Sequence, residues 1–322
     1  MSRALVQTAT AAASSILLLE CFPLSVASQL RKRKEDWTVD RVKTTISGCS
    51  ASVTAGGATK IFVPLSLVRR VADFKKEKQL DAPSLHMWDQ LVGEGALRLC
   101  LSCAEVEEAA TRFAEHKNLC FWVPGGPLVS NIEFKEKFDT FYEYTFPHAM
   151  DVLQQARGES CSVNAWMCSA LTCKYEGVYV PPIRVAETSA ALLKRDYGPT
   201  TVVWEQGIRG LTPRWLETCF KTALSCGVPL SHLAVALSAD ERHPILLHKS
   251  TEAGVASFCC STLPCGFGAA HPLISSADVH SFVEGWNDCR GEDISEREMD
   301  HMETVKEFGA LLEKEFDRCL TV

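Results

Sequence analysis

The stretch from His232 to Pro244, HLAVALSADERHP, contains the residues best suited to acid–base or metal chemistry. Asp240, Glu241 and His243 lie close together in it, and carboxylate and imidazole groups are ligands for divalent cations. They follow an apolar run that is typical of a buried strand. If these three side chains lay close together in space, they would form a metal or acid–base site displaced from the strand end. As members of a solvated polar loop they would have no chemical role, and this second interpretation is the one that we favour.

The chain contains 15 cysteines, an odd number, and most of them stand in apolar runs. This usage indicates buried free thiols in a reducing compartment. Cys100 and Cys103 form a C-x-x-C, but we expect both on one strand, where their side chains would face opposite ways. No second C-x-x-C follows at zinc spacing. Cys168 and Cys173 would be a redox-responsive pair if both were accessible, although inherited buried thiols are the interpretation that we favour.

Two common classes of ligand are disfavoured by the sequence. The glycine-rich segment Thr54–Lys60, TAGGATK, lacks the spacing of a phosphate-binding loop, and no G-x-G-x-x-G stands between a strand and a helix. The formal net charge is −7 with an isoelectric point of about 5.8. Because the strongest basic run, Arg31–Lys34, is short and near the N-terminus, nucleic-acid binding is not expected.

The elements that would position these residues alternate between strands and helices. Pro147 should kink or split the helical pattern that surrounds it, and Thr212 with Pro213 should begin another helix. This order implies a parallel sheet with crossover helices, either closed as an eight-stranded barrel or open and doubly wound. The runs expected as strands include RLCLSC, LCFWVP, SVNAWMCSAL, TVVWE, LAVAL and ASFCCSTL.

Both ends of the chain are expected to lie outside the central domain, which we place at residues 35–290. Residues 1–34 are rich in Ala, Ser and Thr and have no acidic residue before Glu20, as in a mitochondrial presequence. A secretory signal is the rival, but Glu20 interrupts its apolar centre, and the apolar run is too short for a transmembrane helix. Residues 291–322 have the pattern of an amphipathic helix that packs on the barrel or on a partner.

The segment Trp166–Glu187, WMCSALTCKYEGVYVPPIRVAE, resembles the hydroxymethylglutaryl-CoA lyase family, which has a similar cysteine-containing segment ending in Tyr-Glu-Gly. The resemblance continues with GIRGLTPRWLE, PLSHLAVAL and GVASFCCSTLPCGFGAAHP and extends weakly back to VKTTISGCSAS. It implies a TIM (β/α)8 barrel, either complete or in an incomplete or distorted form. It also implies an ancestral reaction, the cleavage of hydroxymethylglutaryl-CoA to acetyl-CoA and acetoacetate with Mg²⁺ or Mn²⁺.

The family's functional groups are missing at the matching positions of this chain. The arginine and metal-binding aspartate after the first strand match Ser50 and Ala51, and a second arginine matches Asn164. A further aspartate matches Gln206, and the lid cysteine matches Ala270. The two metal-binding histidines match Ala236 and Ser238. The resemblance therefore implies that the cation site is lost, so no cofactor is expected.

The loss of the site on a retained scaffold leads to two hypotheses. The first is a catalytically inactive lyase-like subunit of the mitochondrial matrix, with protein partners that include a large assembly or an active lyase paralogue. The second is an acyl-CoA lyase or acyl-CoA-binding protein with a rearranged site.

Overall fold

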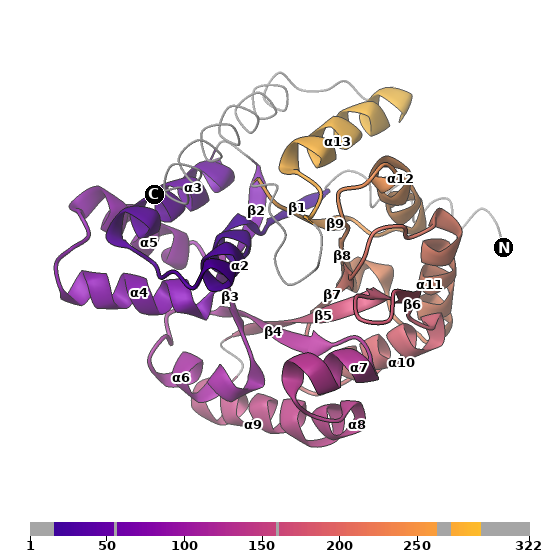
Figure 1. Cartoon of the computed structure of the whole chain (residues 1–322), viewed down its shortest axis with the longest axis horizontal. Coiled ribbons are helices and arrows are strands. Elements are labelled where there is room, and N and C mark those ends of the chain that lie inside the picture. The colour runs from indigo at the N-terminus through magenta and orange to yellow at the C-terminus, as the bar shows by residue number, and fades with distance from the viewer. Residues whose placement is uncertain (1–15, 55–56, 159–160, 263–271, 291–322) are drawn as a thin grey trace.

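Eight parallel strands close into a barrel in the computed structural model, which describes residues 16–54, 57–158, 161–262 and 272–290 (Figure 1). Neighbouring strands pair in chain order, β4 pairs with β5, and β9 returns to β1, so the described sheet is closed. The predicted α/β barrel is confirmed, and the open sheet is excluded. The strands are β1 (Leu17–Glu20), β2 (Ala58–Pro64), β3 (Leu97–Leu101), β4 (Asn118–Pro124), β5 (Ser162–Cys173), β7 (Thr201–Gln206), β8 (Leu233–Ala236) and β9 (Ser257–Cys260), with the short β6 (Val178–Tyr179) antiparallel to the end of β5.

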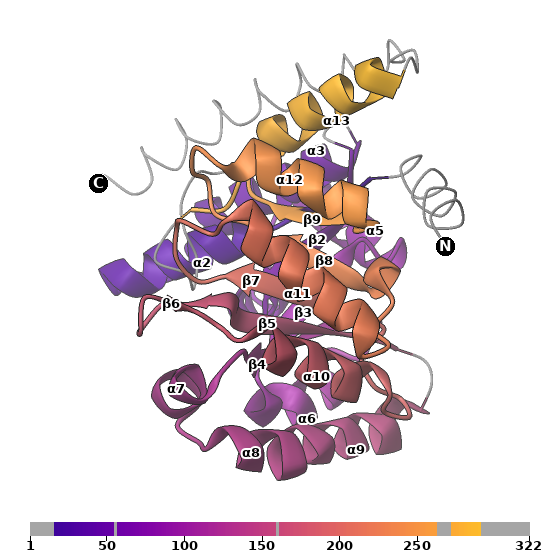
Figure 2. The same cartoon turned by 90° about the vertical axis from the view of Figure 1, so that its right-hand side faces the viewer.

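Helices surround the barrel and cover the outer face of its strands (Figures 1 and 2). They are α2 (Phe22–Arg33), α3 (Val39–Thr54), α4 (Leu65–Lys76), α5 (Ala82–Gly93), α6 (Val106–Thr111), α7 (Pro127–Val129), α8 (Phe138–Thr140), α9 (Phe146–Arg157), α10 (Pro182–Leu193), α11 (Pro213–Ser225), α12 (His243–Ala253) and α13 (Ser276–Arg290). Short 3₁₀ turns lie at Cys103–Glu105 and Leu230–His232, and π turns lie at Ser130–Phe134 and Phe141–Thr145. None of the helices within the described ranges is long and apolar enough to cross a membrane.

One predicted helix start is confirmed by the structure, and one predicted break is not. The Thr212 hydroxyl accepts a hydrogen bond from the backbone N–H of Trp215 at 3.3 Å, so Thr212 caps α11 as predicted. Pro147 lies in the first turn of α9, where its missing N–H is tolerated, and a π turn precedes it. Thr145 and Phe146 both have right-handed helical backbone angles, so the π turn passes into α9 without a break and the chain is not split at Pro147.

Trp204, on the outer face of β7, packs the barrel against two of its helices. Trp204 is fully buried, its indole ring stacks on Phe220 of α11 with centroids 5.7 Å apart, and its Nε1 donates to Ser189 Oγ of α10 at 2.9 Å. Because successive side chains of a strand face opposite ways, Val203 and Glu205 must face the barrel interior. The indole N–H also has a partner, as a buried tryptophan requires.

Large side chains fill the barrel interior. The rings of Phe62 on β2 and Trp166 on β5 meet edge to face with centroids 5.3 Å apart, although these strands are not neighbours. Both side chains must therefore point into the barrel. The guanidinium of Arg98 lies 5.6 Å from the Phe62 ring centroid, and burial lowers the pKa of Arg98. The barrel thus has a packed core and no open channel between these residues.

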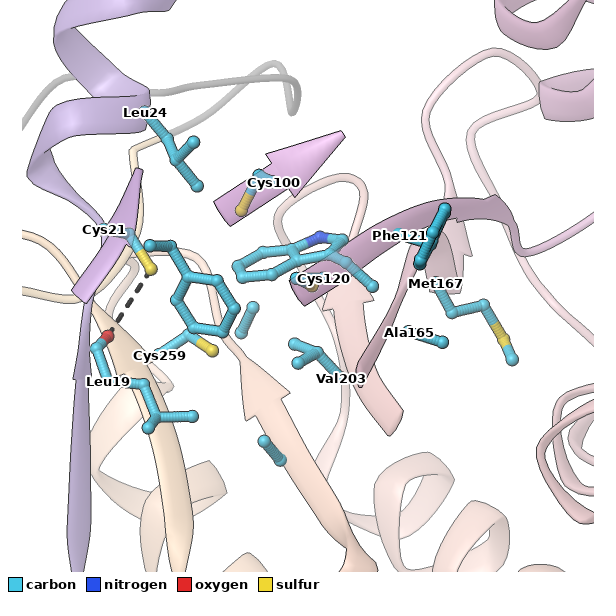
Figure 3. Close-up of a cluster of buried hydrophobic side chains, with 14 of the residues drawn as sticks. Leu19, Cys21, Leu24, Cys100, Cys120, Phe121, Ala165, Met167, Val203 and Cys259 are labelled. Atoms are coloured by element: carbon cyan, nitrogen blue, oxygen red, sulfur yellow. Dashed lines mark hydrogen bonds between the residues drawn. The ribbon is translucent and has the colours of Figure 1, made fainter. Parts of the chain in front are cut away.

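Buried thiols form part of the same core. Figure 3 shows Cys21, Cys100, Cys120 and Cys259 gathered around aromatic rings, and all four are free and buried. Burial raises the pKa of Cys21 and Cys100 well above the usual thiol value. The expectation that most cysteines act as small buried hydrophobes is confirmed for the described residues.

The barrel begins earlier in the chain than the sequence suggested. Residues 17–20 form β1, which pairs with β2 on one side and β9 on the other, and residues 22–33 form α2. The predicted boundary between residues 34 and 35 is therefore wrong. The apolar run that resembled a leader is a central strand, and the basic run of residues 31–34 ends the first helix. Residues 1–15 and the predicted C-terminal helix at 291–322 lie outside the described residues.

Candidate functional site at the carboxyl ends of the strands

The end of β8 carries small, buried residues where the resemblance implies two histidines. Ala236, the last residue of β8, and Ser238 are both fully buried. The Ser238 backbone N–H donates to Gln206 Oε1 at 3.1 Å, while the Ser238 hydroxyl has no hydrogen-bond partner among the described residues. An alanine has no metal-binding atom, and the neighbouring serine offers only a neutral hydroxyl.

The side-chain amide of Gln206, at the end of β7, forms hydrogen bonds with the loops around it through both its oxygen and its nitrogen. Its Oε1 accepts the hydrogen bond from Ser238, and its Nε2 donates to the Ile208 carbonyl at 2.8 Å. Both ends of the side chain amide therefore hold β8 and the β7–α11 loop in place. A carboxylate at this position would lack the N–H donor that Ile208 uses.

The proposed counterparts of the family's first-strand motif are not at the barrel mouth. Ser50 and Ala51 lie in α3, not at the end of a strand, so the alignment of this segment was wrong. The residues that follow the first strand are Cys21, Phe22, Pro23, Leu24 and Ser25. This segment includes neither an arginine nor a carboxylate.

Asn164, another position matched to the family, is also not at the barrel mouth. Asn164 lies near the start of β5, where its Nδ2 donates to the Leu119 carbonyl at 3.2 Å, so it is distant from the carboxyl end of that strand. Ala270 lies outside the described residues. Asn164 therefore supplies no catalytic group to the described site.

Asp240 and His243 act as loop and helix-start residues. The Asp240 carboxylate accepts hydrogen bonds from the backbone N–H groups of Arg242 at 2.8 Å and Gly210 at 3.2 Å. His243 Nδ1 lies 2.6 Å from the Asp240 carbonyl oxygen. This favours the loop interpretation. Across the parts of the chain that the structure describes, no group of three or more His, Cys, Asp or Glu side chains is arranged to hold a metal ion.

The prediction for the first cysteine pair is wrong, whereas the favoured interpretation of the second pair agrees with the structure. Cys100 lies on β3, but Cys103 begins a 3₁₀ turn, so the prediction that one strand carries both was wrong. Cys168 and Cys173 are both buried and free. Burial raises the pKa of each of these four thiols, which lowers their reactivity as nucleophiles.

A carboxylate that the sequence analysis did not single out lies at the mouth of the barrel. Glu205, next to Gln206 on β7, is 2% exposed and accepts a 2.8 Å hydrogen bond from the backbone N–H of Ser169. Burial raises the pKa of Glu205 to about 7; nearby Lys174 and the Ser169 N–H act in the opposite direction. Successive residues of a strand face opposite sides. If Trp204 had been known to face outward, Glu205 could have been expected to face inward.

Charged side chains near Glu205 form a small network with its carboxylate. Lys174 forms an ion pair with Glu133, and the Tyr175 hydroxyl donates to Glu133 Oε1 at 2.7 Å. Burial lowers the pKa of Lys174, but the Glu205 and Glu133 carboxylates outweigh that effect and leave it above its usual value. The network therefore places a cation beside a buried acid that titrates near neutral pH.

The bulge of β5 fixes the geometry of this network. Ser169 has a φ of 55°, in the left-handed region, and the pairing of β5 with β7 is interrupted between Met167 and Thr172. A Cβ atom at Gly207 would lie 2.2 Å from the Thr172 carbonyl oxygen. A Cβ atom at Gly125 would lie 2.5 Å from the Cys168 carbonyl oxygen. Glycine is therefore required on both sides of the bulge.

These features define the protein as a closed α/β barrel with its candidate site at the carboxyl ends of the strands. Among solved structures, it resembles the hydroxymethylglutaryl-CoA lyase from Pseudomonas aeruginosa, with a TM-score of 0.64 and 18% identity over 93% of this chain and 98% of that one. The HMG-CoA lyase from Bacillus subtilis gives a TM-score of 0.65 and 13% identity over 94% and 93% of the two chains. The chain has the fold of the hydroxymethylglutaryl-CoA lyases.

A more distant structural similarity covers part of a longer enzyme. The carboxyl transferase domain of Rhizobium etli pyruvate carboxylase, solved with pyruvate and biocytin, gives a TM-score of 0.57 and 11% identity over 93% of this chain and 47% of that chain. No family model matches the sequence, and no curated protein matches it. The likeness to the lyases therefore rests on the fold.

The described residues do not fit the divalent cation that the resemblance implies. Hard cations of this kind need several carboxylate or comparable donors in fixed geometry. At the corresponding strand ends the chain offers Ala236, a buried Ser238 and a Gln206 whose amide is already hydrogen-bonded. The carboxylates at other strand ends, Glu20 on β1 and Glu205 on β7, belong to no group of three or more possible metal ligands among the described residues. We therefore assign no step of the chemistry to a metal.

Proposed function

We propose that the chain is a catalytically inactive protein with the lyase fold, which serves as a structural or interaction subunit in the mitochondrial matrix. The main support is the end of β8, where Ala236 and Ser238 are buried in the positions that the resemblance assigns to metal-binding histidines. Electrostatic stabilisation of a developing enolate is typically worth several kcal/mol, so its loss would lower the rate by orders of magnitude.

The filled barrel interior supports the same proposal. Phe62 and Trp166 meet across the barrel, and Glu205 and Gln206 are bound to neighbouring backbone groups at the mouth. These contacts retain the barrel as a packed scaffold. A protein that functions through its shape needs the packed core of the barrel but does not need the ligands for the reaction.

An assay of the purified full chain tests the loss of activity. The chain is incubated with hydroxymethylglutaryl-CoA and either Mg²⁺ or Mn²⁺, and acetyl-CoA is measured, with a bacterial lyase assayed in parallel. We expect no metal-dependent product from the chain. Metal-dependent release of acetyl-CoA that is absent when the chain is omitted would overturn the proposal.

Isolation of the native protein tests the location and the partners. We expect the tagged full chain in the mitochondrial matrix, recovered with a constant ratio of the same protein partners after crosslinking and size separation. A large assembly and a complex with an active lyase paralogue would differ in mass. Recovery of the chain solely as a free monomer, or solely outside mitochondria, would contradict this part of the proposal.

Glu205 favours a second candidate, an acyl-CoA lyase or acyl-CoA-binding protein with a rearranged site. A buried carboxyl group with a pKa of about 7 beside Lys174 is suited to proton transfer at neutral pH. Thermal stabilisation by acyl-CoA esters, lost in Glu205→Gln, would support this candidate. No stabilisation by any acyl-CoA ester in the wild-type chain would reject it.

A further inference from the structure

Two basic side chains face the barrel interior at its amino end. Lys60 and Phe62 are two residues apart on β2, so both face the same side of that strand, and Phe62 points inward. Arg98 on β3 is the register partner of Phe62, and its guanidinium lies 5.6 Å from the Phe62 ring centroid. Lys60 and Arg98 are therefore neighbours on adjacent strands, and both charges lie on the inner side of the sheet.

Arg98 has buried hydrogen-bond donors that lack acceptors. Its Nε and Nη1 atoms are both buried, and neither has a hydrogen-bond partner among the described residues. The Phe62 ring attracts the positive charge through its π face but supplies no negative charge of its own. A buried N–H group without an acceptor is costly, and the cost is greater in a charged group. The guanidinium therefore lacks the acceptor that a buried arginine ordinarily has.

The hydrogen-bond partner of Lys60 is a neutral group. Its Nζ donates to the Gly95 carbonyl oxygen at 2.7 Å, and the same oxygen accepts a second bond from Asn118 Nδ2 at 2.8 Å. An ammonium group has three N–H donors, and this bond uses one of them. Burial lowers the pKa of Lys60, and the positive charge of Arg98 lowers it further. The two cations are therefore close enough to repel each other.

No carboxylate of the described residues offsets these two charges. Within those residues, neither Lys60 nor Arg98 forms an ion pair, and no carboxylate raises the pKa of either side chain. Like charges repel strongly in an interior of low dielectric constant, and a buried charge is normally paired. Other arginines of the chain, such as Arg69 with Glu108, have a carboxylate partner even at the surface. The amino end of the barrel therefore carries positive charge that an anion would balance.

We propose that Lys60 and Arg98 together bind a chloride ion at the amino end of the barrel interior. A small monovalent anion accepts hydrogen bonds from the remaining N–H groups of both side chains and reduces their mutual repulsion. Phosphate is less suitable because it is larger and more costly to dehydrate, and Phe62 and Trp166 fill the interior beside Arg98. Both basic side chains are partly exposed, so the ion reaches them from solvent. This site is at the opposite end of the barrel from the candidate functional site and is independent of the proposed function.

Urea unfolding of the full chain at constant ionic strength, with fluoride replaced stepwise by chloride, tests the site. Fluoride is the matched salt because water holds it more strongly. We expect a saturable stabilisation by chloride, so that about ten times the dissociation constant raises the folding equilibrium constant about elevenfold. In crystals soaked in bromide, an anomalous-scattering peak should lie between Lys60 Nζ and the Arg98 guanidinium. A chloride effect that is absent or does not saturate, or no bromide peak at this place, would overturn the proposal.

Matched variants locate the site. Arg98→Met keeps an apolar side chain beside Phe62 but removes the charge, and it should abolish the chloride-dependent stabilisation. Lys60→Met should weaken chloride binding at least about tenfold. Arg214→Met removes an exposed arginine at the start of α11 and should keep the wild-type response. Circular dichroism and a cooperative urea transition establish that each variant is folded. An equal chloride response in Arg98→Met and Arg214→Met would reject the assignment.

Discussion

The backbone N–H of Ser169 and the carboxylate of Glu205 are joined by a hydrogen bond of 2.8 Å, which connects the bulge of β5 to the end of β7. The bond brings a strained residue, with a φ of 55°, against a buried acid whose pKa is raised to about 7. Strain and a raised pKa in one place are typical of functional sites. In this chain the strained residue and the raised pKa occur at the barrel mouth, where the metal ligands implied by the lyase resemblance are missing.

Glu205 should make the stability of the protein fall as pH rises. The pKa of Glu205 is about 7 in the folded chain, whereas its ordinary value is 4.5, so between pH 4.5 and pH 7 the folded chain keeps a proton that the unfolded chain has lost. The unfavourable contribution is absent below about pH 4.5 and grows to about 3 kcal/mol above pH 7. Glu205→Gln should therefore be more stable than the wild type at pH 8 but not at pH 4.5.

Urea unfolding of both proteins from pH 4.5 to 8 measures this difference. Glu143→Gln, an exposed site on the Phe141–Thr145 turn, is the matched control and should follow the wild type at every pH. A Glu205→Gln curve parallel to the wild-type curve would show that Glu205 does not titrate in this range.

His116 should have the opposite effect. Burial lowers the pKa of His116 to about 4 from 6.5, and neither ring nitrogen has a hydrogen-bond partner among the described residues. The unfolded chain binds the proton first, so stability is lost as pH falls from about 6.5 to about 4, by about 3 kcal/mol. His116→Phe should remove this loss and keep the ring contact with Trp88, whose centroid lies 6.0 Å away.

Because His116 and Glu205 titrate in overlapping ranges with opposite slopes, their effects partly cancel in the wild type. The same unfolding series on His116→Phe should therefore expose the slope of Glu205 more clearly than the wild type does. His86→Gln, at an exposed position of α5, is the control. An acid sensitivity of His116→Phe equal to that of His86→Gln would contradict the assignment.

Gly125 should be intolerant of a side chain, whereas its neighbour Gly126 should accept one. A Cβ at Gly125 would lie 2.5 Å from the Cys168 carbonyl oxygen and 2.8 Å from the Ala170 Cα, both backbone atoms, whereas Gly126 has nothing within 4 Å. Gly125→Ala should cost about 2–3 kcal/mol of unfolding free energy, and Gly126→Ala less than about 0.5 kcal/mol. Chemical denaturation measures the unfolding free energy of both variants. Equal losses of unfolding free energy would show that the bulge of β5 moves to make room for the methyl group.

Most of the barrel could be predicted from the sequence because its strands are short apolar runs between helices with clear starts. The N-terminal strand could not, because the apolar residues 17–19 resemble a leader as much as a strand. The segment 39–54 was misplaced because the weak resemblance there matched Ser50 and Ala51 to the residues after the family's first strand. Its buried residues Val42, Thr45, Ile46 and Cys49 nevertheless have helical spacing, and they form the inner face of α3.

The candidate site was predictable only in part. The positions Gln206, Ala236 and Ser238 were found at strand ends, because the resemblance to the lyases is continuous through β7 and β8. Glu205 was missed because neither motif nor resemblance marks it. Its importance depends on the inward direction of its side chain and on the bulge at Ser169, and neither is encoded by local residue patterns.

Removal of the first strand should abolish folding, whereas removal of the residues before it should not. β1 is hydrogen-bonded on both edges, and the buried Glu20 at its end accepts hydrogen bonds from the Thr262 hydroxyl at 2.5 Å and the Ser276 hydroxyl at 2.8 Å. A chain that lacks residues 1–34 loses this strand and α2, leaving β2 and β9 with unpaired backbone groups. A chain that lacks residues 1–15 keeps both elements. We expect a cooperative thermal transition for the shorter deletion and none for the longer one. A cooperative transition in the chain without residues 1–34 would show that the barrel closes without β1.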